Sequence, residues 1–125
     1  MRHQVYGKKL GRDKDERIAL RRILIKQLFE HERIRTTKAK AQAVRGQAER
    51  LITLAKNGNE AGGAKMVHAR RLAAARLSDP AAVRKLFDDI APRFTTRPGG
   101  YTRMTNLGIR HGDAAEMVML ELVEG

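Results

Sequence analysis

Histidine, cysteine and serine side chains, which build most metal sites and nucleophilic sites, are few and scattered in this sequence. The chain has no cysteine and one serine, Ser78, which stands where a helix cap is expected. Its four histidines include no pair at i, i+3 or i, i+4, so their spacing does not suit zinc. Gly99-Gly100 leads into an expected strand, so the chain has neither a P-loop nor a dinucleotide-binding motif. The sequence therefore predicts a binding protein and not an enzyme.

Two groups of carboxylates resemble an acid–base or metal cluster, but each has a simpler structural role. Asp13, Asp15 and Glu16 lie at the start of an expected helix, where acidic side chains cap amides and match the helix dipole. Asp88 and Asp89 are adjacent on another expected helix, where neighbours diverge by about 100°. We interpret them as part of a solvated face. No residue is predicted to hold a metal ion or a cofactor.

The chemistry that the sequence does support is the binding of polyanions. The formal net charge is +12 and the sequence pI is about 10.9. Residues 1–50 hold most of this charge, with 15 basic and 6 acidic side chains. Such a field attracts nucleic acid or an anionic membrane. No apolar stretch approaches the length of about 18 residues that a membrane span needs, so nucleic acid is the expected partner.

Three segments have the composition of phosphate-contacting sites. Residues 1–12 are basic and free of acid, which predicts an extended arm. Residues 36–40 place threonines and lysines at the start of an expected helix, where backbone amides favour an anion. Residues 93–110 carry four arginines, no acid and a Pro-Gly-Gly turn whose glycines let the backbone approach a phosphate.

The candidate nucleic-acid-binding residues combine these three segments with four arginines of the first two expected helices. They are Arg2, His3, Lys8, Lys9, Arg12, Arg17, Arg21, Arg22, Thr36, Thr37, Lys38, Lys40, Arg45, Arg93, Arg97, Gly99, Gly100, Tyr101, Arg103 and Arg110. Two interpretations of Tyr101 stay open, because its ring could stack on a base or pack in the core.

Hydrophobic periodicity predicts four helices and three strands around these segments. The expected helices span residues 14–31, 38–57, 65–77 and 80–91, and the expected strands span residues 33–37, 101–110 and 117–123. Gly58 is expected to end the second helix and open a flexible connector over residues 57–63. Apolar residues wrap most of the first helix, which must therefore be covered on more than one side.

The expected fold class is α/β of the α+β type. About four helices pack on a small, three-stranded mixed sheet, and an extended basic arm precedes them. The turn residues His111-Gly112-Asp113 predict that the last two strands form an antiparallel hairpin. Residues 13–125 are expected to form a single globular domain, with residues 1–12 as the arm.

An ordered set of short motifs runs along the whole chain. The motifs are Met1-Arg-His3, Thr36-Thr-Lys38, Leu51-Ile-Thr-Leu-Ala55, Lys85-Leu-Phe87, Arg93-Phe94, Gly99-Gly-Tyr-Thr-Arg103, Arg110-His-Gly-Asp113 and Glu121-Leu-Val123. Each motif is short, but their order is specific. In this order the chain resembles the bacterial L-seventeen family of large-subunit ribosomal proteins.

The resemblance implies a structural role without catalysis. It implies a small α/β domain bound to large-subunit ribosomal RNA near the polypeptide exit, with neighbouring ribosomal proteins as further partners, in the cytoplasmic ribosome. Residues 1–12 would thread between RNA segments, and the other two segments would contact the RNA backbone. No small-molecule substrate and no membrane are expected. The alternatives are a DNA-binding or nucleoid-associated module, which would require a recognition helix, and an RNA-processing enzyme, for which catalytic residues are lacking.

Overall fold

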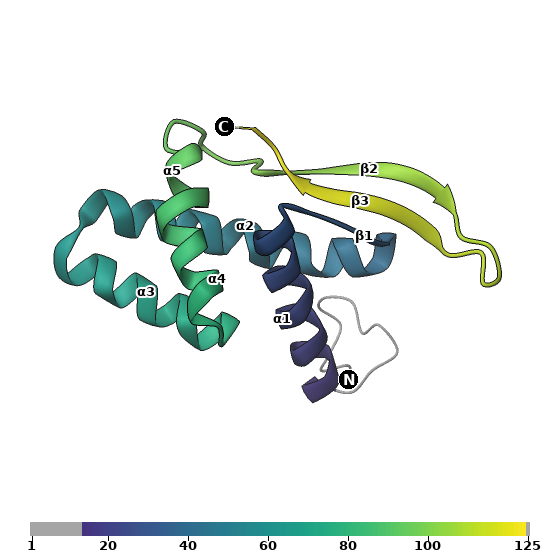
Figure 1. The fold of residues 1–125 in the computed structure, drawn as a ribbon, viewed down its shortest axis with the longest axis horizontal. Coiled ribbons are helices and arrows are strands. Elements are labelled where there is room, and N and C mark those ends of the chain that lie inside the picture. Colours follow the sequence, from purple (N-terminus) through teal and green to yellow (C-terminus); the bar gives the residue numbers. More distant parts are fainter. Residues whose placement is uncertain (1–13, 125) are drawn as a thin grey trace, which may run out of the picture.

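Most helices and strands begin and end close to where the sequence predicts them (Figure 1). The computed structural model describes residues 14–124, so the expected arm at residues 1–12 lies outside the described residues. The helical elements are α1 (Lys14–His31), α2 (Lys38–Ala61), α3 (Gly63–Leu77), α4 (Pro80–Lys85), the π-helical turn η1 (Leu86–Ile90) and α5 (Ala91–Arg93). The strands are β1 (Arg33–Thr37), β2 (Thr102–Ile109) and β3 (Glu116–Leu122). The α+β class is confirmed.

The three strands form a sheet in the order β1-β3-β2, with β3 in the centre. β3 runs antiparallel to both neighbours, so the expectation of a mixed sheet is wrong and the sheet is antiparallel throughout. The predicted hairpin of β2 and β3 is confirmed, and its register shifts at a bulge between Asn106 and Gly108. A bulge adds one residue to one strand and increases its twist. In Figure 1 the hairpin extends to the right, past the N-terminal end of α2.

The junction of α2 and α3 differs from the sequence prediction. Gly58 does not end α2, and residues 57–63 are not a flexible connector, because α2 continues to Ala61. The break comes at Gly62, which has φ +66° and donates its N–H to the carbonyl of Gly58. Gly58 is buried, and a Cβ added to it would lie 2.7 Å from the Cβ of Ala69 on α3. Glycine is needed here for the close approach of two helices, a requirement that a C-cap pattern does not reveal.

The fourth predicted helix is one helical segment with a widened turn in its middle. Asp79 caps it by accepting from the N–H groups of Ala81 and Ala82, as the Asp-Pro sequence predicts. The N–H of Ala91 donates to the carbonyl of Leu86, five residues earlier. Pro92 follows at once and lies inside α5. The wide turn relieves the clash between a proline ring and the carbonyl four residues earlier, so the helix ends just after the proline rather than at it.

The core lies between α2 and the elements that surround it. α2 buries the stripe that the sequence predicts, and β3 covers it with Val118 and Leu120. α1 buries its C-terminal half through Leu28 and Phe29, but Ile18 and Ile23 remain 46% and 48% exposed. The expected cover over more than one side of α1 is therefore incomplete within residues 14–124. Among the described helices, none combines the length and apolar character needed to cross a membrane.

Candidate nucleic-acid interface

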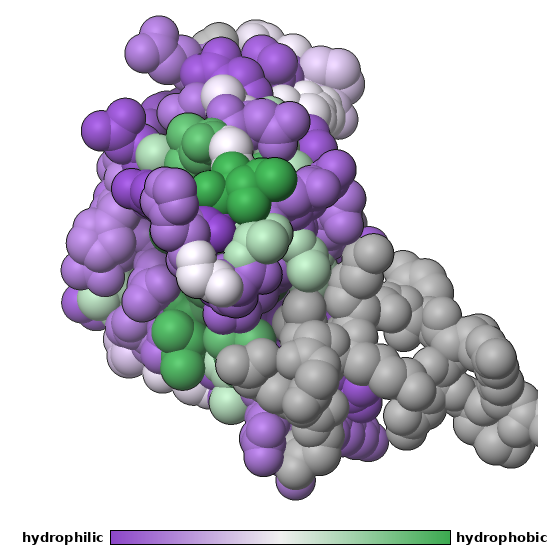
Figure 2. All heavy atoms as spheres, turned by 90° about the vertical axis from the view of Figure 1, so that its right-hand side faces the viewer, coloured by the Kyte–Doolittle hydropathy of each residue, from purple (hydrophilic) through white to green (hydrophobic). Residues whose placement is uncertain are grey.

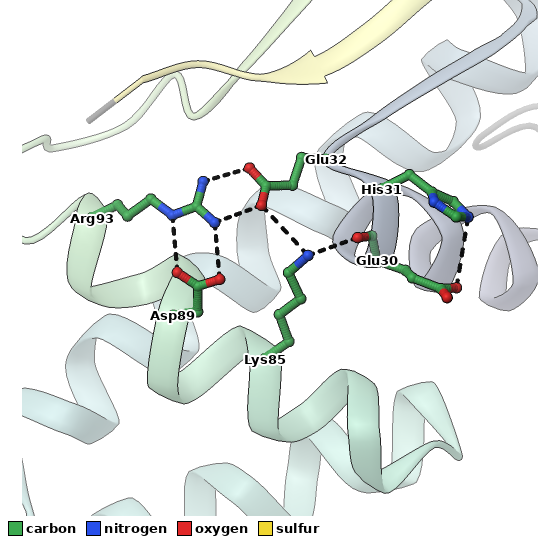
Figure 3. A network of polar contacts seen from close by, with 6 residues as sticks. All are labelled: Glu30, His31, Glu32, Lys85, Asp89 and Arg93. Atoms are coloured by element: carbon green, nitrogen blue, oxygen red, sulfur yellow. Dashed lines mark hydrogen bonds and ion pairs between the residues drawn. The ribbon is translucent and has the colours of Figure 1, made fainter.

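Arg93 lies in a network of ion pairs that joins α5 to the turn after α1 (Figure 3). Its two Nη atoms donate to the Glu32 carboxylate at 2.5 and 2.7 Å, and its guanidinium also binds Asp89. Lys85 Nζ lies 3.4 Å from the same Glu32 carboxylate and donates to the carbonyl of Glu30. The hydrogen bonds from Arg93 hold the pKa of Glu32 at about 2, and the pKa of Arg93 is raised by Glu32 in turn. The charge of Arg93 is therefore largely used within the protein.

Two arginines of the hairpin also have acidic partners. Arg103 on β2 binds Glu121 on β3, with 2.8 Å between Nη2 and Oε1. Arg110 pairs with Asp113 across the hairpin turn, and this contact lowers the pKa of Asp113 to about 2. Three of the four predicted arginines in residues 93–110 thus carry a partner of opposite charge.

Arg97 differs, because its partners are carbonyls and not carboxylates. Its Nε donates to the carbonyl oxygens of Gly99 and Gly100 at 3.2 and 3.1 Å, which closes the turn on itself. Gly100 has φ +62°, a conformation that favours glycine. The turn is thus held in shape while the positive charge of Arg97 is not neutralised.

The structure resolves the two interpretations of Tyr101 in favour of packing. Its side chain is 2% exposed, and its ring lies 5.2 Å from that of Phe94. Its hydroxyl accepts hydrogen bonds from Thr53 and from Lys56 Nζ, at 3.3 and 3.0 Å. Burial opposes ionisation of this hydroxyl, but the two hydrogen bonds and the Lys56 charge outweigh it, so the pKa is lowered. A ring in this position cannot stack on a base.

The start of α2 is partly occupied by contacts within the protein. Thr36 is buried, and the Thr37 hydroxyl accepts from the N–H of Lys40 as the helix cap. Lys38 Nζ lies 3.6 Å from Glu116 on β3. Further along α2, Arg45 donates to the hydroxyl and the carbonyl of Thr102 and fixes the start of β2. Of the predicted basic residues in this segment, Lys40 is the one whose side chain makes no hydrogen bond or ion pair with residues 14–124.

Another set of cations has no hydrogen bond or ion pair of its side chains with any part of residues 14–124. The set, here called the unpaired basic set, consists of Lys14, Arg17, Lys26, Arg33, Arg35, Lys40, Arg50, Lys65, Arg71, Arg76 and Arg84. Most of its members lie on α1, β1, α2 and α3, so the available positive charge is weighted toward these elements and away from the hairpin turn.

Arg33 and Arg35 are the clearest omissions from the sequence-based list. β1 has an alternating burial pattern in which Ile34 and Thr36 face the core and the two arginines face solvent. In the sheet register Arg33 lies opposite Glu121 and Arg35 opposite Met119. The alternation itself is visible in the sequence, and applying the two-residue period of a strand to it would have found both arginines.

Between α1, α2 and α3 lies a cleft of about 290 Å³. Its lining residues are Ile18, Arg21, Arg22, Ile25, Gln47, Leu51, Ala75 and Arg76. Arg22 is oriented by a hydrogen bond of 2.8 Å from its Nε to the carbonyl of Arg76. Three arginines and no acid of residues 14–124 belong to this lining, so the described part of the cleft is basic with an apolar floor.

The face at the hairpin end of the molecule is largely hydrophilic, with limited hydrophobic areas (Figure 2). Figure 2, which faces the hairpin end of the molecule, shows hydrophobic residues gathered in separate areas within a hydrophilic surface. The exposed large hydrophobic residues include Leu107 and Ile109 of β2, at 43% and 66% exposure. No group of three or more histidine, cysteine or acidic side chains suited to a metal ion occurs in residues 14–124.

Comparison with known proteins gives one consistent result. A sequence model of the family described as Ribosomal protein L17 matches residues 20–123. The Large ribosomal subunit protein bL17 of Symbiobacterium thermophilum is 53% identical over 115 residues, which cover 92% of this chain and 96% of the relative. The protein of the same name from Geobacter sulfurreducens is 49% identical over 124 residues, covering 99% of this chain and 67% of the relative. A third, from Caldanaerobacter subterraneus subsp. tengcongensis, is 49% identical over 116 residues, covering 93% and 97%.

Proposed function

This chain belongs to the ribosomal protein L17 family, and we propose that it stabilises folded large-subunit ribosomal RNA by binding it through unpaired basic side chains. As a member of the family it is a structural component of the large ribosomal subunit in the cytoplasmic ribosome, and it is not an enzyme. Its partners are the ribosomal RNA and other ribosomal proteins. The proposal concerns which surface meets the RNA.

The observation that carries this proposal is the division of the cations into two groups. Arg93, Arg103 and Arg110 are each held by an acid of the same chain. The unpaired basic set keeps its full charge and is spread over α1, β1, α2 and α3. Phosphate binding releases counterions in proportion to the phosphates that cations neutralise. A cation that is already neutralised by a carboxylate contributes less, so the unpaired set supplies most of the RNA contact.

We assign to residues 93–103 the role of presenting a turn of fixed shape to the RNA, rather than of supplying most of the positive charge. The Arg93 network fixes the end of α5 against α1, and the Arg97 contacts close the turn that leads into β2. Gly99 and Gly100 let the backbone of this turn approach a phosphate closely. Arg97 is then the arginine of this segment that meets the RNA with its charge available.

The position within the subunit and the role of the N-terminal arm rest on the sequence motifs of the family. We place the protein near the polypeptide exit, with residues 1–12 threaded between RNA segments through Arg2, His3, Lys8, Lys9 and Arg12. The remaining residues act as one domain that presents the unpaired basic set.

The decisive experiment has two measurements. The native protein is expected to sediment with the large ribosomal subunit and to stay bound after a high-salt wash, because its fit to the folded RNA persists where salt weakens the phosphate contacts. The purified protein is expected to bind folded large-subunit ribosomal RNA more tightly than duplex DNA of arbitrary sequence at matched salt. Equal affinity for the two nucleic acids would favour a nucleoid-associated protein instead.

A further inference from the structure

The cleft between α1, α2 and α3 combines an apolar floor with a positively charged rim. Ile18, Arg21, Arg22 and Ile25 occupy positions i, i+3, i+4 and i+7 of α1, so they line one face of that helix. Gln47 and Leu51 contribute one face of α2, and Ala75 and Arg76 contribute the end of α3. Leu51 and Ile25 form the buried floor, at 2% and 4% exposure.

The size of the cleft matches one aromatic ring system better than an extended ligand. Its volume is about 290 Å³. Pockets for drug-sized ligands start at about 300 Å³. A single nucleobase fits in such a space, whereas several linked nucleotides do not.

The groups at the rim match the edges of a nucleobase. Arg22 lines the cleft and is anchored through its Nε, while its two Nη groups make no hydrogen bond with residues 14–124. The Gln47 amide offers both a donor and an acceptor. Unpaired RNA bases are recognised when they are splayed out, stacked on apolar or guanidinium surfaces and hydrogen-bonded along their edges.

We propose that this cleft receives one unpaired nucleobase of the ribosomal RNA. The ring packs on Ile18, Leu51 and Ala75, the Gln47 amide and the Arg22 Nη groups bind its edge, and Arg76 contacts the phosphate next to it. The inference rests on the proposed function, since it names a feature of the RNA that this protein binds. The occupant is RNA rather than an apolar side chain of another protein, because Arg22 and Arg76 line the cleft and no acid among residues 14–124 does.

The test fills the cleft without disturbing the core. Ala75 is exposed and lines the cleft, so Ala75→Phe places a ring where the base would lie. The neighbouring Ala74 is also exposed but does not line the cleft, so Ala74→Phe is the matched control. Arg22→Gln tests the edge contact, with Arg103→Gln, whose guanidinium pairs with Glu121 outside the cleft, as its control. Melting curves establish that each variant is folded.

The measurements are the affinity for folded large-subunit ribosomal RNA and the reactivity of its bases toward base-specific chemical probes. Wild type and Ala74→Phe are expected to protect the Watson–Crick edge of one unpaired nucleotide, which becomes reactive with Ala75→Phe. The affinity of Ala75→Phe is expected to fall about 10-fold, the scale of one lost base stack, with the salt dependence unchanged. Replacing the protected nucleotide by an abasic one should lower the RNA affinity of the wild type as much as Ala75→Phe does. The same replacement should not lower the affinity of Ala75→Phe any further.

Three outcomes separate the possibilities. If Ala75→Phe binds and protects like Ala74→Phe, the inference is wrong. If Arg22→Gln lowers the salt dependence while Ala75→Phe has no effect, the cleft contacts only backbone phosphate, which also overturns it. If the wild type itself fails to prefer ribosomal RNA, the proposed function fails, and the cleft inference falls with it.

Discussion

At the scale of single residues, whether an arginine has an internal acidic partner decides how much it can add to RNA binding. Arg35 and Arg103 both project from the sheet at exposed positions, but only Arg103 has a carboxylate partner, Glu121. We expect Arg35→Gln to weaken RNA binding and to reduce the slope of log affinity against log salt by about 0.9, the contribution of one phosphate contact. Arg103→Gln should change the slope by much less.

Filter binding at several salt concentrations measures both slopes. Arg84→Gln on α4, which also lacks a partner among residues 14–124, reports whether any unpaired arginine has the same effect wherever it lies. Equal slopes for Arg35→Gln and Arg103→Gln would contradict the division of the cations into paired and unpaired groups.

The Glu32 network predicts a specific loss of stability in acid. The pKa of Glu32 is about 2 in the folded protein against an ordinary value of 4.5. Its ionised form therefore stabilises the fold above about pH 4.5, and this contribution is lost as the pH falls from there toward 2. Because the Glu32 side chain is 38% exposed, solvent screening reduces the expected contribution to about 1 kcal/mol.

Urea unfolding at pH 6 and at pH 3 measures this contribution. Glu32→Gln should lower the free energy of unfolding at pH 6 and have little effect near pH 2, so its stability falls less steeply with acid than that of the wild type. Glu60→Gln, at an exposed position of α2 without a hydrogen bond or ion pair to the described residues, is the control and should follow the wild type. An unchanged pH profile in Glu32→Gln would show that the network does not stabilise the fold.

At the scale of elements, two glycines of α2 should respond to alanine in opposite directions. Gly58→Ala would place its Cβ 2.7 Å from that of Ala69, so α2 and α3 must separate, at a cost of about 1–3 kcal/mol. Gly46→Ala meets only the Arg50 guanidinium at 3.7 Å and should stabilise the helix by about 0.5–1 kcal/mol. Thermal unfolding of the two variants checks the sign. If both substitutions stabilise the protein, the close approach of α2 and α3 at Gly58 does not contribute to stability.

The sequence predicts elements well where the signal is local and less well where packing decides. The bounds of α1 and β1 are predicted correctly because apolar periodicity and capping lie within each element. Gly58 was misinterpreted because Asn-Gly-Asn has the pattern of a helix end, while its actual role depends on α3. The π-helical turn has no local signal beyond Pro92.

The candidate site shows the same limit. The composition predicts a cationic surface, but the pairing of Arg93 with Glu32 joins residues 61 positions apart and has no local signature. The burial of Tyr101 likewise depends on Thr53 and Lys56 of α2. The sequence gives the total number of lysines and arginines. The tertiary structure decides which of them are paired with acids and which remain available to bind RNA.

At the scale of the whole molecule, the N-terminal arm and the folded domain should be separable. Deleting residues 1–12 removes four lysines and arginines. We expect the truncated protein to unfold cooperatively, because the core residues of the described part of the chain run from Leu24 to Leu122. Its affinity for ribosomal RNA should fall about 10-fold or more at moderate salt. Circular dichroism melting and filter binding measure the two effects. Loss of the cooperative transition would show instead that the arm belongs to the core.

The central position of β3 has a consequence for how the protein is made. β3 is the last strand in chain order, yet it is the only strand that pairs with both β1 and β2 among residues 14–124. A nascent chain translated as far as residue 115 contains β1 and β2 but lacks β3, the strand with which both of them pair. Its helices can already form at this stage. The sheet, and the apolar layer that it lays over α2, must wait until residues 116–122 have left the synthesising ribosome. Formation of the sheet is therefore expected to follow formation of the helices, and to precede stable incorporation into a new ribosome.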